Sequence, residues 1–398
     1  MLADSADIEV SLLTGGIDKP YAFGLAMALM SRDIRLDFIG SDEIDSPELR
    51  ARPSLNYLNL RGNQRPDASF GTKVRRILIY YARLIRYGAL AKQKLFHILW
   101  NNKFETFDRT VLMLYYKALG KKLVLTAHNV NAGKRDSNDS LLNRLTLGIQ
   151  YRLADHIFVH TESMKRELLV DFHVRDEAVT VIPLGINNAV PQTDLSSAEA
   201  KRRLGLANSD KAILFFGSIS PYKGLEYAVT AFQQLSATSR DYRLIIAGRP
   251  GQGCEPYLEE VQKTIAAHAS RDRVIQKIEF IPDEETELYF KAADVLALPY
   301  THVFQSGVLV LAYSFGLPVI ASDVGPLKEE VVDGTTGYLC RPRDAANVAE
   351  TIERYFASNL FKNLSARRSQ IRDYGRSRFS WDVVADRTRA VYTELLFQ

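Results

Sequence analysis

The chain has 398 residues, of which 46% are hydrophobic and 25% are charged, the ordinary composition of a folded protein of about two domains. Its 51 basic and 47 acidic side chains leave a formal net charge of only +4. This balance and the lack of a recognised motif argue against a nucleic-acid partner. Two cysteines are too few for a disulfide framework, a cysteine-rich zinc site or an iron–sulfur cluster.

Short apolar runs alternate with longer helical patterns along the chain. Such runs indicate strands buried on both faces, as in parallel sheets covered by helices. The sequence therefore predicts an α/β protein of two doubly wound, Rossmann-like domains. The runs are Ile8–Thr14, Arg35–Gly40, Phe96–Trp100, Lys122–Ala127 and His156–His160 in the first half, and Lys211–Gly217, Tyr242–Gly248, Ile278–Ile281, Val295–Pro299 and Pro318–Ser322 in the second.

The turn-forming stretch Ile182–Pro191 marks the expected domain boundary. We predict an N-terminal domain over residues 1–188 and a C-terminal domain over residues 189–378. Residues 379–398 are typical of a helix, which we expect to pack back toward the N-terminal domain. Because no apolar run reaches the roughly 18 residues of a membrane span and the N-terminus is acidic, unlike a signal peptide, we expect a cytoplasmic protein.

Three loops that follow predicted strands contain glycine, and in doubly wound sheets such loops bind ligands. They are residues 14–16 (Thr-Gly-Gly), 217–224 (Gly-Ser-Ile-Ser-Pro-Tyr-Lys-Gly) and 304–308 (Phe-Gln-Ser-Gly-Val). Glycines let the backbone approach a ligand, and Lys223 can neutralise a phosphate. The structural alternatives are an ordinary strand-to-helix turn, a surface lysine and a helix cap at Ser306.

Histidines also follow predicted strands. His128 comes directly after the run Lys122–Ala127, where an imidazole can bind a sugar hydroxyl or transfer a proton. His160 and His302 occupy similar positions, and for His302 we expect a structural role.

Taken together, these motifs resemble those of the retaining GT-B glycosyltransferases known as glycosyl transferases group 1 (family 4). The similarity is strongest over Ala212–Pro342, and the residues Gln-Ser-Gly-Val at 305–308 resemble a bacterial subset that lacks the first glutamate of the family's E-x7-E pattern. The motifs that carry the resemblance are Phe216-Gly217, Tyr222-Lys223-Gly224, Leu244–Gly248, Phe280–Asp283, Ala292–Asp294 and Gly316–Ala321, and more loosely Gly15-Gly16, His128-Asn129 and Ile182–Gly185.

The resemblance implies two Rossmann-like domains that face a central cleft. A sugar donor linked to uridine or guanosine diphosphate would bind mainly to the C-terminal domain. A glycan, a lipid-linked sugar or a small molecule would be the acceptor, held by the N-terminal domain. Neither a metal nor a resident cofactor is implied, because basic side chains and helix N-termini stabilise the departing diphosphate in such enzymes.

The same resemblance assigns roles to individual residues. Lys223 would face the diphosphate, and Gly16 would approach it from across the cleft. The backbone around Ile281 would contact the base, and His128 would lie against the donor sugar as the catalytic residue. The full set of implied donor-binding residues is Gly15, Gly16, Lys223, Arg249, Ile281, Gln305, Ser306, Gly307 and Val308.

The chain departs from the family pattern at the donor loop. Phe304 and Ala312 occupy the positions of the two glutamates of E-x7-E, and Ser218 replaces an arginine of the phosphate loop. Arg249 would have to supply the lost positive charge. Gln305 would replace one sugar contact by hydrogen bonding, whereas nothing obvious replaces the ribose carboxylate.

A basic helix is predicted near residues 73–94, which contain seven basic residues and no acidic one. We expect its apolar stripe to pack on the sheet. Its basic face would either be solvated or turn toward anionic lipid or a pyrophosphate-linked lipid acceptor, which would place the protein at the inner face of the plasma membrane. The stripe consists of Val74, Ile77, Leu78, Tyr81, Leu84, Ile85 and Leu95.

Three functions are compatible with these observations. The first is a retaining glycosyltransferase of polysaccharide or glycolipid biosynthesis, acting by front-face displacement. The second is a degenerate, non-catalytic scaffold of the same fold, favoured by the loss of both glutamates and the arginine. The third is a nucleotide-sugar 2-epimerase, which would need acid and base carboxylates that the loop at Phe304 does not offer.

Overall fold

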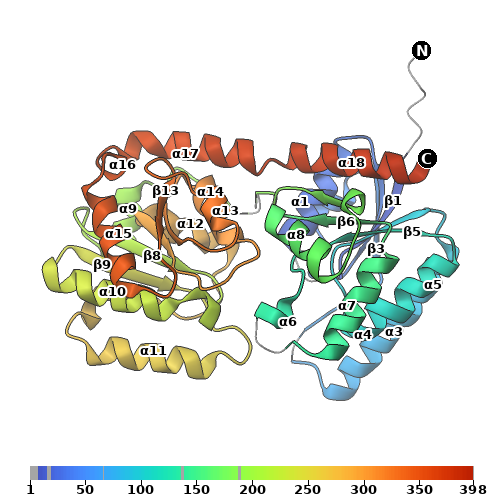
Figure 1. Cartoon of the computed structure of the whole chain (residues 1–398), viewed down its shortest axis with the longest axis horizontal. Coiled ribbons are helices and arrows are strands. Elements are labelled where there is room, and N and C mark those ends of the chain that lie inside the picture. The colour runs from blue at the N-terminus through green and yellow to red at the C-terminus, as the bar shows by residue number, and fades with distance from the viewer. Residues whose placement is uncertain (1–7, 16–18, 66, 136–138, 187–189, 398) are drawn as a thin grey trace, which may run out of the picture. The chain divides into compact units, whose positions relative to one another are not determined.

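The computed structural model describes residues 8–15, 19–65, 67–135, 139–186 and 190–397 (Figure 1). The chain divides into two compact units. The first comprises Met1–Gly185 together with Ser380–Gln398, and the second comprises Ile186–Phe379. Each unit is built around one parallel sheet, so the predicted α/β class with two Rossmann-like sheets is confirmed.

The sheet of the first unit has, among the described residues, seven strands in the order β3-β2-β1-β4-β5-β6-β7. All of its pairings are parallel, and the order reverses between β1 and β4, as in doubly wound folds. The strands are β1 (Glu9–Leu13), β2 (Arg35–Gly40), β3 (Leu55–Asn59), β4 (Leu95–Ile98), β5 (Lys122–Thr126), β6 (His156–Val159) and β7 (Val179–Val181).

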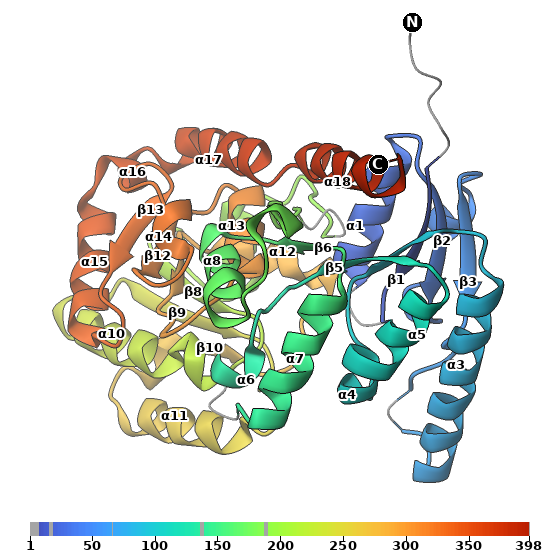
Figure 2. The same ribbon diagram turned by 45° about the vertical axis from the view of Figure 1, so that its right-hand side comes forward.

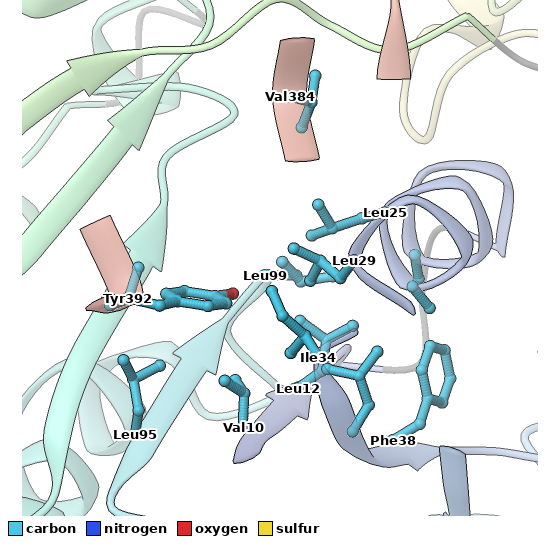
Figure 3. Close-up of a cluster of buried hydrophobic side chains, with 14 of the residues drawn as sticks. Val10, Leu12, Leu25, Leu29, Ile34, Phe38, Leu95, Leu99, Val384 and Tyr392 are labelled. Carbon is cyan, nitrogen blue, oxygen red and sulfur yellow. The ribbon is translucent and has the colours of Figure 1, made fainter. Parts of the chain in front are cut away.

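One face of this sheet is covered by two helices that are far apart in the sequence, α1 (Lys19–Met30) and α18 (Trp381–Phe397). Figure 3 shows side chains of both helices beside those of the strands. Helix α18 belongs to the first unit, because apolar side chains of this helix are buried in the same core. The labelled members of the core are Val10, Leu12, Leu25, Leu29, Ile34, Phe38, Leu95, Leu99, Val384 and Tyr392.

The opposite face is covered by α3 (Phe70–Leu90) and α5 (Met113–Ala118). Tyr87 of α3 donates a hydrogen bond to Asp37 (2.7 Å) and accepts one from Ser11 (2.6 Å), which satisfies polar groups under the helix. The remaining helices of this unit are α2 (Pro47–Arg50), α4 (Glu105–Phe107), the π-helical turn η1 (Asp108–Leu112), α6 (Ala132–Arg135), α7 (Leu141–Leu153), α8 (Glu162–Asp171) and η2 (Asp176–Ala178).

The second unit contains six parallel strands among the described residues, in the order β10-β9-β8-β11-β12-β13. These strands are β8 (Lys211–Phe216), β9 (Tyr242–Ala247), β10 (Val274–Lys277), β11 (Val295–Leu298), β12 (Val319–Ser322) and β13 (Gly337–Cys340). Its helices are α9 (Ser197–Arg203), η3 (Pro221–Lys223), α10 (Leu225–Thr238), α11 (Glu255–Ala267), η4 (Arg271–Arg273), α12 (Asp283–Ala292), α13 (Gly307–Ser314), α14 (Leu327–Glu330), α15 (Ala345–Ala357), α16 (Asn359–Lys362) and α17 (Leu364–Arg378).

Several strand predictions differ from the structure at the sheet edges. The strand predicted at Ile278–Ile281 is wrong: β10 lies earlier, at Val274–Lys277, and the side chain of Phe280 is 62% exposed in the loop that follows. The edge strands β3 and β13 and the short β7 were not predicted. Edge strands are covered less completely than central ones, so they need not form continuous apolar runs.

The prediction that the apolar stripe of the basic helix packs on the sheet is wrong in part. Leu84 is buried, but the side chains of Leu78 and Val74 are 60% and 39% exposed. The reason is length: α3 has 21 residues and spans about 31 Å, whereas the strands of this sheet have three to six residues and span at most about 20 Å. Figure 2 shows one end of α3 extending past the strands. No helix in the described ranges is both long and apolar enough to cross a membrane.

Candidate active site

The loop after β8 brings a lysine and a helix N-terminus together at the carboxyl end of the strand. Its turn is made by Gly217, whose φ of +95° favours glycine. A Cβ at this position would lie 3.3 Å from Cγ2 of Val308 and 3.4 Å from Nζ of Lys223. The absence of a side chain therefore lets an ammonium group and the first turn of α13 approach the same point.

Lys223 is not an ordinary surface lysine, because its side chain is only 7% exposed. It ends the 3₁₀ turn η3, and Gly224, with φ +67°, joins that turn to α10. A Cβ on Gly224 would collide with the carbonyl oxygen of Pro299, so only glycine fits there without a shift. The Nζ atom of Lys223 lies 5.9 Å from the ring centroid of Tyr300. The ammonium is thus held in place by the loops around it.

The predicted residues 305–308 form the start of α13. Ser306 is buried and is the N-cap, since its hydroxyl oxygen accepts a hydrogen bond from the Leu309 amide at 3.3 Å. The helix-cap role that the sequence analysis considered for Ser306 is therefore present. Gly307 and Val308 occupy the first turn, where helical amides have no partner within the helix. Phe304 and Ala312, at the glutamate positions, are both buried.

Arg249 and Ile281 lie on the loops that follow β9 and β10. The guanidinium carbon of Arg249 is 5.2 Å from the ring centroid of Phe280, which immediately precedes Ile281. The carbonyl of Arg249 also accepts a hydrogen bond from the Ile219 amide (2.8 Å), which joins this loop to the phosphate loop. The second unit therefore gathers Lys223, Arg249, Ile281 and the start of α13 at one edge of its sheet.

In the first unit, His128 lies in a cage of rings at the carboxyl ends of the strands. Trp100 stacks on it with a centroid distance of 4.2 Å, and Tyr21 meets it edge-on at 4.6 Å. A Cβ on Gly15 would lie 3.0 Å from the carbonyl oxygen of Trp100, so this glycine allows a close approach of the two loops. Gly16 lies outside the described residues.

The hydrogen bonds of His160 fix the protonation of His128. Nδ1 of His160 lies 3.2 Å from the carbonyl oxygen of Ile182, which can only accept, so this nitrogen carries the proton. Nε2 of neutral His160 is then an acceptor, and Nδ1 of His128 donates to it across 3.1 Å. As a result, Nε2 of His128 is an acceptor, able to receive a hydrogen bond from a hydroxyl group.

Burial keeps both imidazoles neutral. It lowers the pKa of His160 to about 4, and it lowers the pKa of His128 well below the ordinary value, with a further contribution from the neighbouring His160. The environment therefore favours a hydrogen-bonding role for His128 over a permanent positive charge.

A cavity of about 500 Å³ adjoins His128 within the first unit and is rich in amide side chains. The amides of Asn101 and Gln150 pair with each other, with Nε2 of Gln150 donating to Asn101 at 2.8 Å. Arg109 reaches the same cavity and donates to Asn143 (2.8 Å). Sequence reasoning missed these residues, although Asn101 and Asn102 follow β4 and the rule applied to His128 would have found them.

Two family models match the chain and together cover most of it. Residues 196–378 match the model "Glycosyl transferases group 1", and residues 19–190 match the model "Glycosyltransferase Family 4". The chain belongs to the group 1 glycosyltransferases. The predicted family is therefore confirmed, and each match falls mainly on one structural unit.

Curated relatives of this glycosyltransferase include two D-inositol 3-phosphate glycosyltransferases. That of Corynebacterium aurimucosum is 26% identical over 69% of this chain and 66% of its own length. That of Thermobispora bispora is 31% identical over 61% of this chain and 57% of its own. The chain thus spans about two thirds or less of the length of the curated relatives it matches.

Solved structures confirm the predicted GT-B fold. HepE of Anabaena, crystallised with UDP and glucose, superposes with a TM-score of 0.74 at 18% identity over 98% of this chain and all of that one. WaaG, a glycosyltransferase of lipopolysaccharide biosynthesis, gives a TM-score of 0.67 at 16% identity over the same shares of the two chains. At these identities the likeness concerns the fold.

Proposed function

We propose that this glycosyltransferase is a retaining enzyme that moves a sugar from a nucleoside diphosphate sugar to a glycan, lipid-linked or small-molecule acceptor, without a metal ion. The observation that carries the proposal concerns the position that a Cβ on Gly217 would take. It lies within 3.4 Å of Nζ of the buried Lys223 and of Cγ2 of Val308, in the first turn of α13. A positive charge and free helical amides are the groups that bind a diphosphate.

The proposed reaction is a front-face displacement. The bond between the anomeric carbon and the diphosphate oxygen breaks, and the acceptor hydroxyl oxygen bonds to the same face of that carbon. The hydroxyl proton passes to the departing diphosphate, so no separate base is required. Lys223 and the amides of α13 would stabilise the negative charge that develops on the leaving group.

His128 would orient the donor sugar. Its Nε2 is an acceptor, so we propose that it receives a hydrogen bond from a sugar hydroxyl. The amide-lined cavity beside it is the proposed site of the acceptor, since asparagine and glutamine side chains both donate to and accept from hydroxyl groups. Arg249, beside Phe280 and Ile281, would contribute to the nucleotide end of the donor.

The nucleotide can be identified by a thermal-shift screen with UDP, GDP and ADP and their sugar conjugates. UDP is the first to test, because HepE was crystallised with UDP and with UDP-glucose. A ligand present at 100 times its dissociation constant should add about 2.7 kcal/mol of stability. If no nucleotide stabilises the protein, donor binding has been lost and the non-catalytic scaffold becomes the better explanation.

The phosphate site is tested by Lys223→Ala. We expect at least a tenfold weaker binding of the nucleoside diphosphate, about 1.5 kcal/mol, because a buried charge partner of the diphosphate is removed. Lys263→Ala, which removes an exposed lysine of the same unit, is the matched control and should bind as the wild type does. Equal affinities of the two variants would place the diphosphate elsewhere.

A further inference from the structure

A second concave site lies in the first unit, where α3 extends beyond the sheet. It is a groove of about 420 Å³. Its walls are residues 61–65 after β3, the first half of α3, and residues 103–104 after β4. The groove and the His128 cavity are lined by consecutive residues. Asn102 lines the cavity, and the next two residues, Lys103 and Phe104, line the groove.

The floor of the groove is apolar and held in place. The rings of Tyr81 and Phe104 stack with a centroid distance of 5.5 Å. The Tyr81 hydroxyl accepts from the Phe104 amide (3.0 Å) and donates to the buried carboxylate of Asp108 (2.9 Å). Tyr80 donates to Asn102 at 2.6 Å.

The rim of this fixed floor is open to solvent. The side chains of Phe70 and Val74 on the rim are 83% and 39% exposed, and that of Phe104 in the floor is 49% exposed. Exposed apolar side chains gathered around a concave surface are typical of a binding site.

The charge of the groove is entirely positive. Arg61, Arg65, Lys73, Arg76 and Lys103 line it, and none of its lining residues is acidic. Within the described ranges, none of these five side chains forms an ion pair with a carboxylate. The guanidinium of Arg61 lies 5.4 Å from the ring centroid of Tyr80, and its Nη1 atom is buried without a hydrogen-bond partner among the described residues.

We propose that the groove binds one molecule of an anionic amphiphile, with a phosphate or diphosphate group at the cations and a hydrocarbon chain along the aromatic floor. The cations and the apolar side chains come from the same short segments, so a ligand with both properties fits better than a free anion. Where the amphiphile is the lipid carrier of a sugar acceptor, this inference rests on the proposed function. The carrier phosphate would lie in the groove and the sugar hydroxyl in the adjoining cavity.

A single bound molecule makes a different prediction from a membrane surface. Membrane attachment through the basic helix would use all of its exposed cations, including Arg75 and Arg86, which do not line the groove. A bound amphiphile would use Arg76 and Lys73 of the same helix, together with Arg61 from another segment. Substitutions of Arg75 and Arg86 and substitutions of the groove residues therefore distinguish a membrane surface from a single bound amphiphile.

The probe is farnesyl diphosphate, measured by isothermal titration calorimetry with the full chain. Arg76→Gln and Arg61→Gln should each weaken binding about tenfold, while Arg75→Gln and Arg86→Gln should stay within about twofold of the wild type. Farnesol and inorganic diphosphate, which each present half of the ligand, should bind at least about tenfold more weakly. Circular dichroism would verify that each variant is folded.

Two results would overturn the proposal. One is inorganic diphosphate binding as tightly as farnesyl diphosphate. The other is the absence of farnesyl diphosphate binding while the protein sediments with phosphatidylglycerol vesicles and Arg75→Gln, Arg76→Gln and Arg86→Gln weaken that sedimentation equally. A UDP thermal shift on the same samples keeps the two proposals apart, because Lys223 belongs to the other unit. If farnesyl diphosphate binds and UDP does not, the groove proposal stands and the transferase proposal is refuted. If UDP binds and farnesyl diphosphate does not, the transferase proposal stands and the groove proposal is refuted.

Discussion

Single residues decide the chemistry of the first unit, and the histidines are the clearest case. Burial lowers the pKa of His97 to about 3 and the pKa of His156 and His160 to about 4, and it also lowers that of His128. Below pH 6.5 the unfolded chain takes up protons at these sites and the native state does not. Stability should therefore fall as the pH is lowered from 6.5 to about 4, by about 1.4 kcal/mol per pH unit for each such histidine.

The measurement is a pH titration of the histidine ring signals by NMR, combined with urea unfolding at pH 7 and pH 5.5. The four buried rings should show no midpoint near 6.5 in the native protein, and the free energy of unfolding should be lower at pH 5.5. A native midpoint near 6.5 for His128 would show that burial does not keep its imidazole neutral.

Packing at the residue scale can be tested with two glycines in helices. A Cβ on Gly24 of α1 would collide with the indole of Trp381, whereas one on Gly148 of α7 would meet nothing within 4 Å. Gly24→Ala should therefore destabilise the first unit by about 1–3 kcal/mol through overpacking. Gly148→Ala should stabilise it by about 0.5–1 kcal/mol through helix propensity. Urea unfolding of both variants gives the comparison, and a neutral Gly24→Ala would mean that α18 can shift without cost.

At the scale of elements, the sequence could predict the central strands but not the edges. Strands such as Lys122–Thr126 are covered on both faces and therefore appear as apolar runs, whereas the edge strand Val274–Lys277 contains glutamine and lysine. The placement of α3 was beyond sequence reasoning for a different reason. A helical wheel gives the direction of Val74 and Leu78, but whether a strand lies opposite them depends on the length of the sheet.

The candidate site was predictable to the extent that it depends on loops. Glycines and a lysine after a strand indicated residues 217–224, and a histidine after a strand indicated His128. The burial of Lys223 and the proton arrangement of His128 and His160 could not be predicted, because both depend on contacts between segments distant in sequence. The groove was missed because its cations come from three separate segments.

At the scale of the whole molecule, the two units differ in how the chain builds them. The second unit is a single continuous segment, Ile186–Phe379, whereas the first is completed by Ser380–Gln398. We expect residues 186–379 to fold when produced alone. Residues 1–185 alone should be destabilised, because the core around Leu25 and Leu29 would lose Val384 and Tyr392 of α18.

Circular dichroism and urea unfolding of the two fragments would test this expectation. A synthetic peptide of residues 380–398 should restore the cooperative unfolding of the fragment 1–185, and the same peptide with Tyr392→Ala should restore less. If the fragment unfolds as cooperatively without the peptide as with it, α18 does not belong to its core.

The contact between His97 and Tyr392, with 2.5 Å between Nδ1 and the hydroxyl oxygen, joins residues that are 295 positions apart. During synthesis, every strand of the second unit leaves the ribosome before α18 does. The second unit can therefore fold while the first still lacks one of the helices that cover its sheet. The apolar surface that α18 will cover stays exposed throughout that interval, so the newborn first unit is the part of the chain that chaperones would hold longest.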